Sequence, residues 1–481
     1  MGIVSANGPD AAPRKQTLST NYLDFTDGST GWEQQYLPDL MEKEAEIYGK
    51  RTISGFLSQI GAEEASQSDS VVWSEQGRLH LAYKGTVTNA ANSTITITTD
   101  VDGNTVGNKH GIRVGDTVLI SGGNVTLKAY VTVSNTGLSS PTAVITVAPY
   151  AQEALATGSN FANNAAVTVL VYGSEFNKGT DGRNSANAPQ FKSYTNKHLI
   201  MKDFYEVSGS DTSAIGWVEV TGEEGQSGYL WYLKAEGDTR ARFADYLEMS
   251  MMESELNDGT ALLIGGTDKG AKESGTEGLF AAINARGNVT TDLGASGAAA
   301  NLASFDAVLA TFDAQGAIEE NMMFLNRAQA LKVDDMLAGL NPHVTNGVSF
   351  GVFDNAEDMA LNLGFSGFRR GSYDFYKTDW KYLNDKGTRG VINSTAGTSA
   401  IRGVIIPAGT STVYDEQIGK NLKRPFLHVR YRSSETDDRK MKTWVTGSVG
   451  ASTSGKDVME VHYLSERCLV TQGANNFMLI Q

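Results

Sequence analysis

Residues 229–257 read YLWYLKAEGDTRARFADYLEMSMMESELN, and their apolar side chains repeat with the 3.6-residue period of an amphipathic helix. The main stripe consists of Tyr229, Leu233, Phe243, Leu247 and Met251. Tyr232, Tyr246 and Leu256 widen that stripe, whereas Arg240, Arg242, Asp245, Glu248 and Glu253 keep to the opposite side. Because no proline interrupts the pattern, it predicts one helix roughly 40 Å long. Gly237 weakens the middle of this helix by about 1 kcal/mol relative to alanine, so packing must hold it straight.

The composition restricts the class of protein. The 481 residues are enough for several domains, and 52 glycines against 9 prolines favour extended segments and tight turns over a helical bundle. The net charge of −15 argues against avid nucleic-acid binding, which needs clustered lysine and arginine. Cys468 is the only cysteine, which excludes an intrachain disulfide, and no run of 18 apolar residues predicts a membrane span. We expect an ordered protein without a membrane partner.

Residues 1–50 predict an N-terminal arm followed by a short acidic helix. The first 37 residues are polar and cannot bury enough surface to fold alone, yet they carry four large aromatic side chains. These four residues are Tyr22, Phe25, Trp32 and Tyr36. An arm that lies across a neighbouring subunit accounts for both observations, and a disordered terminus is the alternative.

The composition changes abruptly between residues 85 and 173, where methionine and tryptophan are absent, charge is scarce and threonine is abundant. Short alternating runs separated by turn residues predict a small β-barrel or β-sandwich inserted into a host. The flanking segments, 51–84 and 174–222, predict the outgoing and returning strands of an extended hairpin whose tip carries the insert.

The remaining segments predict a mixed architecture. Residues 223–275, which contain the long helix, and residues 426–481, which read as strands, are assigned to one domain. Residues 276–425 mix helical and strand patterns without βαβαβ regularity and are assigned to another domain. The fold class that follows is α+β.

Three partial motifs are weighed against plainer interpretations. Residues 347–351 fit G-x-S-x-G but lack the strand before and the helix after that a nucleophile elbow requires. Residues 265–272 begin like a phosphate loop, but Glu273 stands where a serine or threonine should follow. Asp100, Asp102 and Asn104 have calcium-loop spacing without the later glycine and glutamate, so a hairpin turn is the better interpretation.

No constellation of catalytic or metal-binding residues stands out. The six histidines are scattered without a zinc-site spacing. Asp374 and Asp379 are the one pair that suggests glycosidase carboxylates, and surface charges are the plainer interpretation. We expect no enzymatic activity, no metal and no cofactor.

The order of the segments resembles the major capsid proteins of tailed bacteriophages, which have the Hong Kong 97-like fold. The C-terminal stretch HYLSERCLVTQGANNFMLI is similar to the family's final segment through Glu466, Arg467, Ala474 and Phe477, with apolar residues at 469 and 470. KSYTNKHLIMKDFYEVSGS resembles the family's descending hairpin strand, and YLKAEGDTRARFADYLEM resembles its spine helix. The style of the arm and insert suggests a crAss-like phage within the Caudoviricetes.

This resemblance implies a structural protein of the virion, assembled in the host cytoplasm into hexamers and pentamers of an icosahedral head that encloses double-stranded DNA. The implied domains are N-arm, extended loop, spine helix, peripheral domain (223–275 and 426–481) and axial domain (276–425). The implied partners are other copies of the chain, portal, scaffolding and auxiliary, head-decoration or head-fibre proteins, and DNA through weak contacts. The arm aromatics would anchor on a neighbour, and Leu233, Phe243, Leu247 and Met251 would pack the spine helix.

Some capsids of this type are cross-linked by a Lys–Asn isopeptide bond. Candidates by name are Lys178 or Lys192 with Asn475 or Asn476. Two other functions stay open: an encapsulin-like nanocompartment shell, and a carbohydrate-active phage tail protein, which predicts a β-helical repeat that the sequence lacks.

Overall fold

A computed structural model describes residues 56–57, 62–106, 110–135, 143–157, 161–182, 191–210, 219–221, 227–257, 275–291, 293, 302–339, 367–395, 397–408, 410–415, 420–447 and 455–481. The chain divides into two compact units, Met1–Arg51 and Thr52–Gln481. The first unit, with the four arm aromatics, lies outside the described residues. The second unit is mixed α+β and rich in sheet, which confirms the predicted class.

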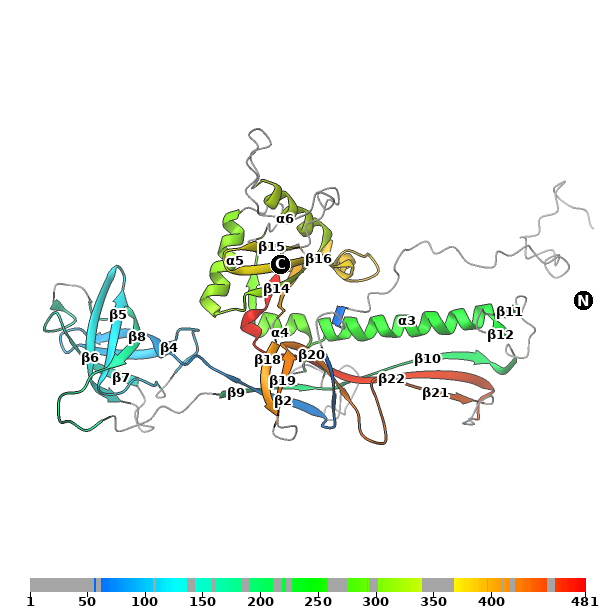
Figure 1. Ribbon diagram of the computed structural model, residues 1–481, viewed down its shortest axis with the longest axis horizontal. Helices are drawn as coiled ribbons and strands as arrows, with labels where there is room; N and C mark the ends of the chain where they lie inside the picture. The colour runs from blue at the N-terminus through cyan, green and yellow to red at the C-terminus, as the bar shows by residue number, and fades with distance from the viewer. Residues whose placement is uncertain are drawn as a thin grey trace, which may run out of the picture. The chain divides into compact units, whose positions relative to one another are not determined.

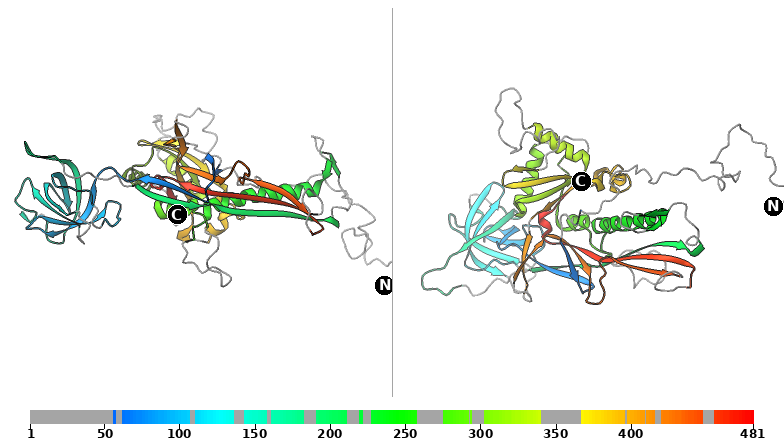
Figure 2. Two further views of the ribbon diagram at one scale, coloured as in Figure 1. Left: turned by 90° about the horizontal axis from the view of Figure 1, so that it is seen from below. Right: turned by 45° about the vertical axis from the view of Figure 1, so that its right-hand side comes forward.

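A five-stranded sheet carries the long helix. Its central strand is β22 (Val458–Thr471), which pairs antiparallel along one edge with β10 (Leu199–Ser208). Along its other edge β22 pairs with β21 (Lys442–Gly447) and, farther on, with β20 (Leu427–Arg432). β1 (Ala62–Ser66) adds in parallel to β20. The helix α3 (Leu230–Glu253) runs alongside β10 and β22 (Figures 1 and 2).

The α3 helix forms where its period predicts it, but its buried face is shifted. Phe243, Leu247 and Met251 are buried as expected, and Met252 joins them. Tyr246, which we expected on the apolar stripe, is 44% exposed. Leu256 is exposed and lies beyond the end of the helix. Glu248, expected on the polar side, is buried, and its charge interacts with the Arg467 guanidinium of β22.

A six-stranded sheet forms the second layer of the body. Its order is β13 (Asn288–Thr290), β23 (Met478–Ile480), β17 (Gly403–Pro407), β14 (Glu320–Leu325), β16 (Tyr373–Asp379) and β15 (Gly367–Arg370). Its helices are α4 (Leu279–Arg286), α5 (Leu302–Gln315), α6 (Arg327–Gly339) and the short α7 (Arg389–Asn393). β23 therefore lies in the sheet of the 276–425 block, whereas we assigned it to the other domain. The reason is its pairing with β17 and β13.

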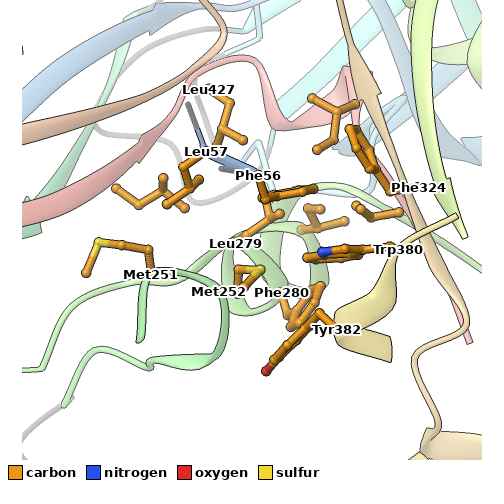
Figure 3. Packing of buried hydrophobic residues seen from close by; sticks show 14 of the residues in the cluster. Phe56, Leu57, Met251, Met252, Leu279, Phe280, Phe324, Trp380, Tyr382 and Leu427 are labelled. Atoms are coloured by element: carbon orange, nitrogen blue, oxygen red, sulfur yellow. The ribbon is translucent and has the colours of Figure 1, made fainter. Parts of the chain in front are cut away.

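One apolar cluster joins the two sheets to the end of α3. Phe56 stacks on Trp380 with ring centroids 4.2 Å apart and meets Phe324 edge-on at 4.7 Å (Figure 3). Met251 and Met252 of α3, Leu279 of α4, Leu427 of β20 and Leu479 of β23 belong to the same cluster. The burial of these side chains fixes the helix end, both sheets and residues 56–57 as one packed unit.

A two-stranded ribbon leaves this body. β2 (Ser70–Gln76) pairs antiparallel with β9 (Phe191–Lys197), from Ser70 opposite Lys197 to Gln76 opposite Phe191. Two further short hairpins, β11 (Glu219–Thr221) with β12 (Ser227–Tyr229) and β18 (Thr410–Asp415) with β19 (Lys420–Pro425), complete the strands. Single turns of 3₁₀ helix lie at η5 (Lys381–Leu383), η6 (Gly397–Ser399) and η7 (Ala474–Asn476).

The chain between β2 and β9 forms a closed six-stranded barrel. In chain order its strands are β3 (Ala82–Asn89), β4 (Thr94–Asp100), β5 (Asp116–Gly122), β6 (Val125–Asn135), β7 (Ala143–Pro149) and β8 (Ala166–Ser174). Around the barrel they follow the order β3-β4-β7-β6-β5-β8. Alternate residues such as Val87, Ile95, Ile120 and Ile145 fill an apolar interior of its own.

Candidate assembly site

The base of the β2–β9 ribbon is fixed to the body by one buried amide, that of Asn196. Its Nδ2 donates to the carbonyl oxygens of Leu469 at 2.6 Å and Glu277 at 3.0 Å. Its Oδ1 accepts from the Glu277 and Lys197 backbone N–H groups, both at 2.8 Å, and from the Thr276 hydroxyl at 3.1 Å. Asn196 is fully buried, and its side chain thus ties β9, β22 and the segment before α4 together.

Arg286 at the end of α4 forms the second tie. Its guanidinium lies over the Tyr194 ring at 4.6 Å and the Trp73 ring at 5.6 Å, one from each strand of the ribbon. It also pairs with Glu277 at 2.5 Å and approaches Glu75 at 4.0 Å. The Glu75 carboxylate in turn accepts from the Trp73 indole N–H and from the Gly473 backbone N–H. We define Trp73, Tyr194, Asn196, Glu277 and Arg286 as the ribbon junction.

On its face away from the junction the ribbon presents apolar side chains to solvent. Val72 of β2 is 60% exposed and Phe191 of β9 is 63% exposed. Leu79, which follows β2 on the way to the barrel, is also exposed. Two-stranded ribbons are marginally stable in water without a further packing surface. The ribbon thus packs one face on the body, where Val71 and Trp73 meet Cys468 and Val470, and leaves the other face uncovered.

The outer face of the five-stranded sheet carries exposed aromatic rings among polar side chains. On the face away from α3, His462 stacks on Trp444 at 5.1 Å and lies 6.0 Å from Phe204, so three aromatic rings cross three adjacent strands. Phe204 and its neighbour Ile200 on β10 are more than half exposed. Burial of these exposed rings against another subunit would favour association.

Glu466 of the C-terminal motif lies in a charged network under the loop between β20 and β21. It is buried, and its carboxylate pairs with Arg432 at 3.1 Å and with Arg439. Arg432 also reaches Asp69 at 3.1 Å, on the chain that enters the ribbon. Glu466 thus connects the central strand to both neighbouring segments through paired charges, which is how a buried carboxylate is tolerated.

Arg467 points to the other side of β22. Its guanidinium donates to the Ser465 hydroxyl and to the Lys440 carbonyl oxygen, each at 2.9 Å. Burial lowers the pKa of Arg467, and the charges of Glu63 and Glu248 raise it in partial compensation. Glu466 and Arg467 therefore hold the 433–441 loop in place from two sides.

The C-terminal end of α3 is fastened to the segment after β16. Glu253 accepts a hydrogen bond of 2.6 Å from the Tyr382 hydroxyl and pairs with Arg389. Arg389 also lies over the Phe280 ring at 5.5 Å. Burial, together with the bond to Glu253, raises the pKa of Tyr382. These contacts fasten the helix end to the segment that follows β16.

The other predicted site residues lie as follows. Phe477 is fully buried in the cluster that joins the two sheets. The backbone of Leu233 lies in α3, and its side chain is outside the described residues, as are Tyr22, Phe25, Trp32 and Tyr36.

Among the cross-link candidates, Lys192 lies over the Tyr194 ring, and Lys178 is exposed. Asn475 donates to the Gln315 carbonyl oxygen and Asn476 to that of Gly473, so the cross-link stays a prediction.

The partial motifs acquire plain structural roles where they are described. Asp100 accepts from the backbone and side-chain amides of Asn104, and Gly103 has a φ of +90°, so this segment is a turn. Asp374 pairs with Arg369 and Asp379 with Arg327. The two aspartates are five residues apart on β16 and therefore project from opposite faces. Residues 347–351 and 265–272 lie outside the described residues.

Within the described residues, no group of three or more His, Cys, Asp or Glu side chains is arranged to hold a metal ion. Among the helices in that part of the chain, none combines the length and hydropathy needed to cross a bilayer.

The sequence did not reveal the ribbon junction or the contacts of Glu253 with Tyr382 and Arg389. Asn196, Arg286 and Glu253 acquire their partners from positions between 9 and 273 residues away, apart from the Lys197 N–H that bonds to Asn196. The only local signal was the aromatic pair Trp73 and Tyr194, in two segments predicted as strands of one hairpin.

Comparison with known proteins gives structural likeness at low identity. No protein-family model and no curated protein matches the sequence. A chain of Microbacterium phage Oxtober96 gives a TM-score of 0.38 at 8% identity, covering 95% of this chain and 99% of that chain. A chain of Mycobacterium phage Ogopogo gives 0.39 at 11% identity, covering 93% and 98%. A chain from the capsid of the native GTA particle gives 0.37 at 11% identity, covering 94% and 97%. This chain is thus similar, at low TM-score and low identity, to solved chains from two phages and a GTA capsid.

Proposed function

We propose that this protein is a structural shell subunit, a major capsid protein of the Hong Kong 97-like type. Its copies form the pentamers and hexamers of an icosahedral phage head around double-stranded DNA. One observation carries the proposal: the β2–β9 ribbon is built rigidly onto the body at Asn196 and Arg286 but leaves Val72 and Phe191 uncovered. An element that is positioned firmly and packed incompletely needs a partner surface.

Another copy of the same chain is the simplest source of that surface. Each copy offers the ribbon, the Ile200–Phe204 face of β10 and the arm, so every subunit can contact several neighbours. Heterologous contacts of this kind close into rings when the rotation between copies is suitable. Individually modest contacts become strong together because each one holds the next at high effective concentration.

The body supplies the stiffness that repeated contacts require. Glu253 fastens α3 to Tyr382 and Arg389, and Glu466 fastens β22 to Arg432 and Arg439. A rigid body transmits the ribbon position accurately from one subunit to the next. In this proposal Tyr22, Phe25, Trp32 and Tyr36 anchor the arm on a neighbour, and Leu233 extends the packed face of α3.

The mechanism is assembly without chemical turnover. The net charge of −15 limits adhesion of the shell to the packaged DNA, so the genome would be held by confinement and weak contacts. The same proposal includes portal, scaffolding and auxiliary or head-fibre proteins as partners of the shell. It also assigns the chain to a crAss-like phage.

Sedimentation of the purified full-length protein, followed by nuclease treatment, tests this function. We expect fast-sedimenting closed particles when the chain assembles alone, and nuclease-protected DNA in particles recovered from infected cells. Particles that enclose an enzyme instead of DNA would favour the encapsulin-like alternative. A protein that sediments as a monomer at every concentration, with or without scaffolding, would contradict shell formation.

A further inference from the structure

The outer wall of the barrel carries a row of aromatic rings that the proposed shell function does not use. Tyr130 of β6 lies opposite Ala148 of β7 on one side and opposite Thr117 of β5 on the other. Tyr150 follows β7 on the same side of the wall, and its backbone N–H bonds to the Lys128 carbonyl oxygen of β6. On the other side of β5, Gly173 of β8 lies opposite Thr117.

A β-bulge turns a further ring into this row. Thr117 pairs with Gly173 and Val118 pairs with Val171, so Tyr172 is an extra residue in β8. Such bulges re-aim a side chain, and they occur often beside functional surfaces of barrels. Tyr172 is 53% exposed and Tyr150 is 52% exposed, although either ring would gain from burial.

Two contacts hold the rings in position. The Tyr150 hydroxyl donates to Oε2 of Glu175, which raises the pKa of Tyr150 to about 12, with smaller contributions from Tyr172 and Tyr130 nearby. The Phe176 ring covers Gly115, whose φ is +91°, so closely that a Cβ there would lie 2.9 Å from the ring. We define Tyr130, Tyr150 and Tyr172 as the tyrosine platform; Glu175 is bonded to Tyr150, and Phe176 follows Glu175 in the chain.

We propose that the tyrosine platform binds a neutral glycan. The face of an aromatic ring carries negative charge and attracts the polarised C–H groups on the apolar face of a pyranose, while the area covered leaves water. Sugar hydroxyl groups at the ring edge need hydrogen-bond partners, which the tyrosine hydroxyls and the Glu175 carboxylate can provide. Several rings in a row suit successive sugar units of one chain.

The charge of the barrel selects this class of ligand. Residues 82–176 contain only 9 Asp, Glu, Lys and Arg side chains, 4 of them basic, whereas charged residues make up 20% of the whole chain. A nucleic acid would need concentrated lysine and arginine along its phosphates. The residues between the rings are Thr117, Ala148 and Gly173, which lack the aliphatic bulk of a typical protein interface core. This inference does not depend on shell formation.

Biolayer interferometry with the full-length protein tests the inference. Separate sensors would carry galactomannan, xyloglucan and asialo-mucin, with an uncoated sensor as reference. We expect saturable binding to at least one of them, weakened about tenfold or more in Tyr150→Leu and in Tyr172→Leu, because leucine keeps apolar bulk without a ring face. Tyr150→Phe keeps the ring and should retain most of the binding.

Tyr376→Leu is the matched control, since Tyr376 is an equally exposed tyrosine on β16, outside the barrel. Its binding should equal that of the wild type, and circular dichroism would verify that each variant folds. Absence of binding to all three glycans would overturn the inference, as would full binding by both leucine variants. Loss of self-association in those variants, without glycan binding by the wild type, would identify the platform as a contact between copies and would also overturn it.

Discussion

At the scale of single residues, Asn196 shows how much of the fold depends on side chains that look ordinary in sequence. Its amide makes five hydrogen bonds to groups of β9, β22 and residues 276–277. A buried donor or acceptor that loses its partner costs about 1–3 kcal/mol. The replacement of this side chain therefore affects three segments at once.

We predict that Asn196→Leu lowers the free energy of unfolding by about 3 kcal/mol or more, because it leaves buried carbonyl and N–H groups without partners. Guanidinium unfolding followed by tryptophan fluorescence measures the change. Asn177→Leu is the control, because Asn177 is exposed and its replacement should stay within about 0.5 kcal/mol of the wild type. Equal midpoints for the two variants would refute the role of Asn196.

Cys468 gives a second prediction at this scale. It is fully buried opposite Arg430, and burial raises the pKa of its thiol to about 12. The native thiol therefore stays protonated at pH 8 and should not react with a disulfide reagent such as DTNB, whereas the unfolded chain should titrate one thiol.

The raised pKa of Cys468 also makes the stability of the folded protein depend on pH. The folded state favours the protonated thiol, so the associated stability is fully present below the unfolded pKa of about 9 and is lost as pH rises toward about 12. The Cys468→Ala variant should lack this component of the alkaline loss of stability. Rapid labelling of native Cys468 at pH 8 would show that the thiol is accessible.

At the scale of elements, α3 was predictable because its signal is local. Phe243, Leu247 and Met251 are separated by single turns, and this spacing alone indicates a helix with one buried face. The burial of Glu248 was not predictable, because the charge that it interacts with belongs to Arg467, on a strand more than 200 residues later. The 44% exposure of Tyr246 was also not evident from the helical period. Ribbon strands were likewise visible from alternation, but the junction residues were not.

A substitution in α3 should stabilise the protein. Gly237 is exposed in the helix interior, and an added Cβ would meet no atom within 4 Å. Gly237→Ala should therefore raise the free energy of unfolding by about 1 kcal/mol through helix propensity. Gly278→Ala is the contrasting variant, because its Cβ would lie 2.8 Å from the backbone oxygens of Met252 and Ser254 and should destabilise. Thermal unfolding of both variants measures these opposite changes in stability. A lower melting temperature for Gly237→Ala would show that the site does not accept a Cβ.

Arg286→Met tests the ribbon junction. Methionine keeps much of the length but removes the cation that lies over Trp73 and Tyr194, an interaction worth about 1–2 kcal/mol when partly desolvated. Hydrogen–deuterium exchange should become about tenfold faster in β2 and β9 and stay unchanged in α6. The control Arg369→Met removes an exposed arginine paired with Asp374 and should leave ribbon exchange as in the wild type. Unchanged exchange in Arg286→Met would exclude this tie.

At the scale of the whole molecule, segment order is readable from sequence while strand order is not. The change in composition at residue 85 indicates an all-β segment, but the path β3-β4-β7-β6-β5-β8 depends on pairings between strands far apart in the chain. The placement of β23 beside β17 and β13 has the same cause. Local pattern specifies each element, and non-local pairing specifies its neighbours.

In our proposal other copies of this chain cover the exposed ribbon, and cryo-electron microscopy of the assembled full-length protein can show whether they do. We predict closed shells of five- and six-fold capsomers in which Val72 and Phe191 are buried against a neighbouring subunit. Uniform monomers, or shells in which the β2–β9 ribbon of every subunit remains in solvent, would contradict the claim.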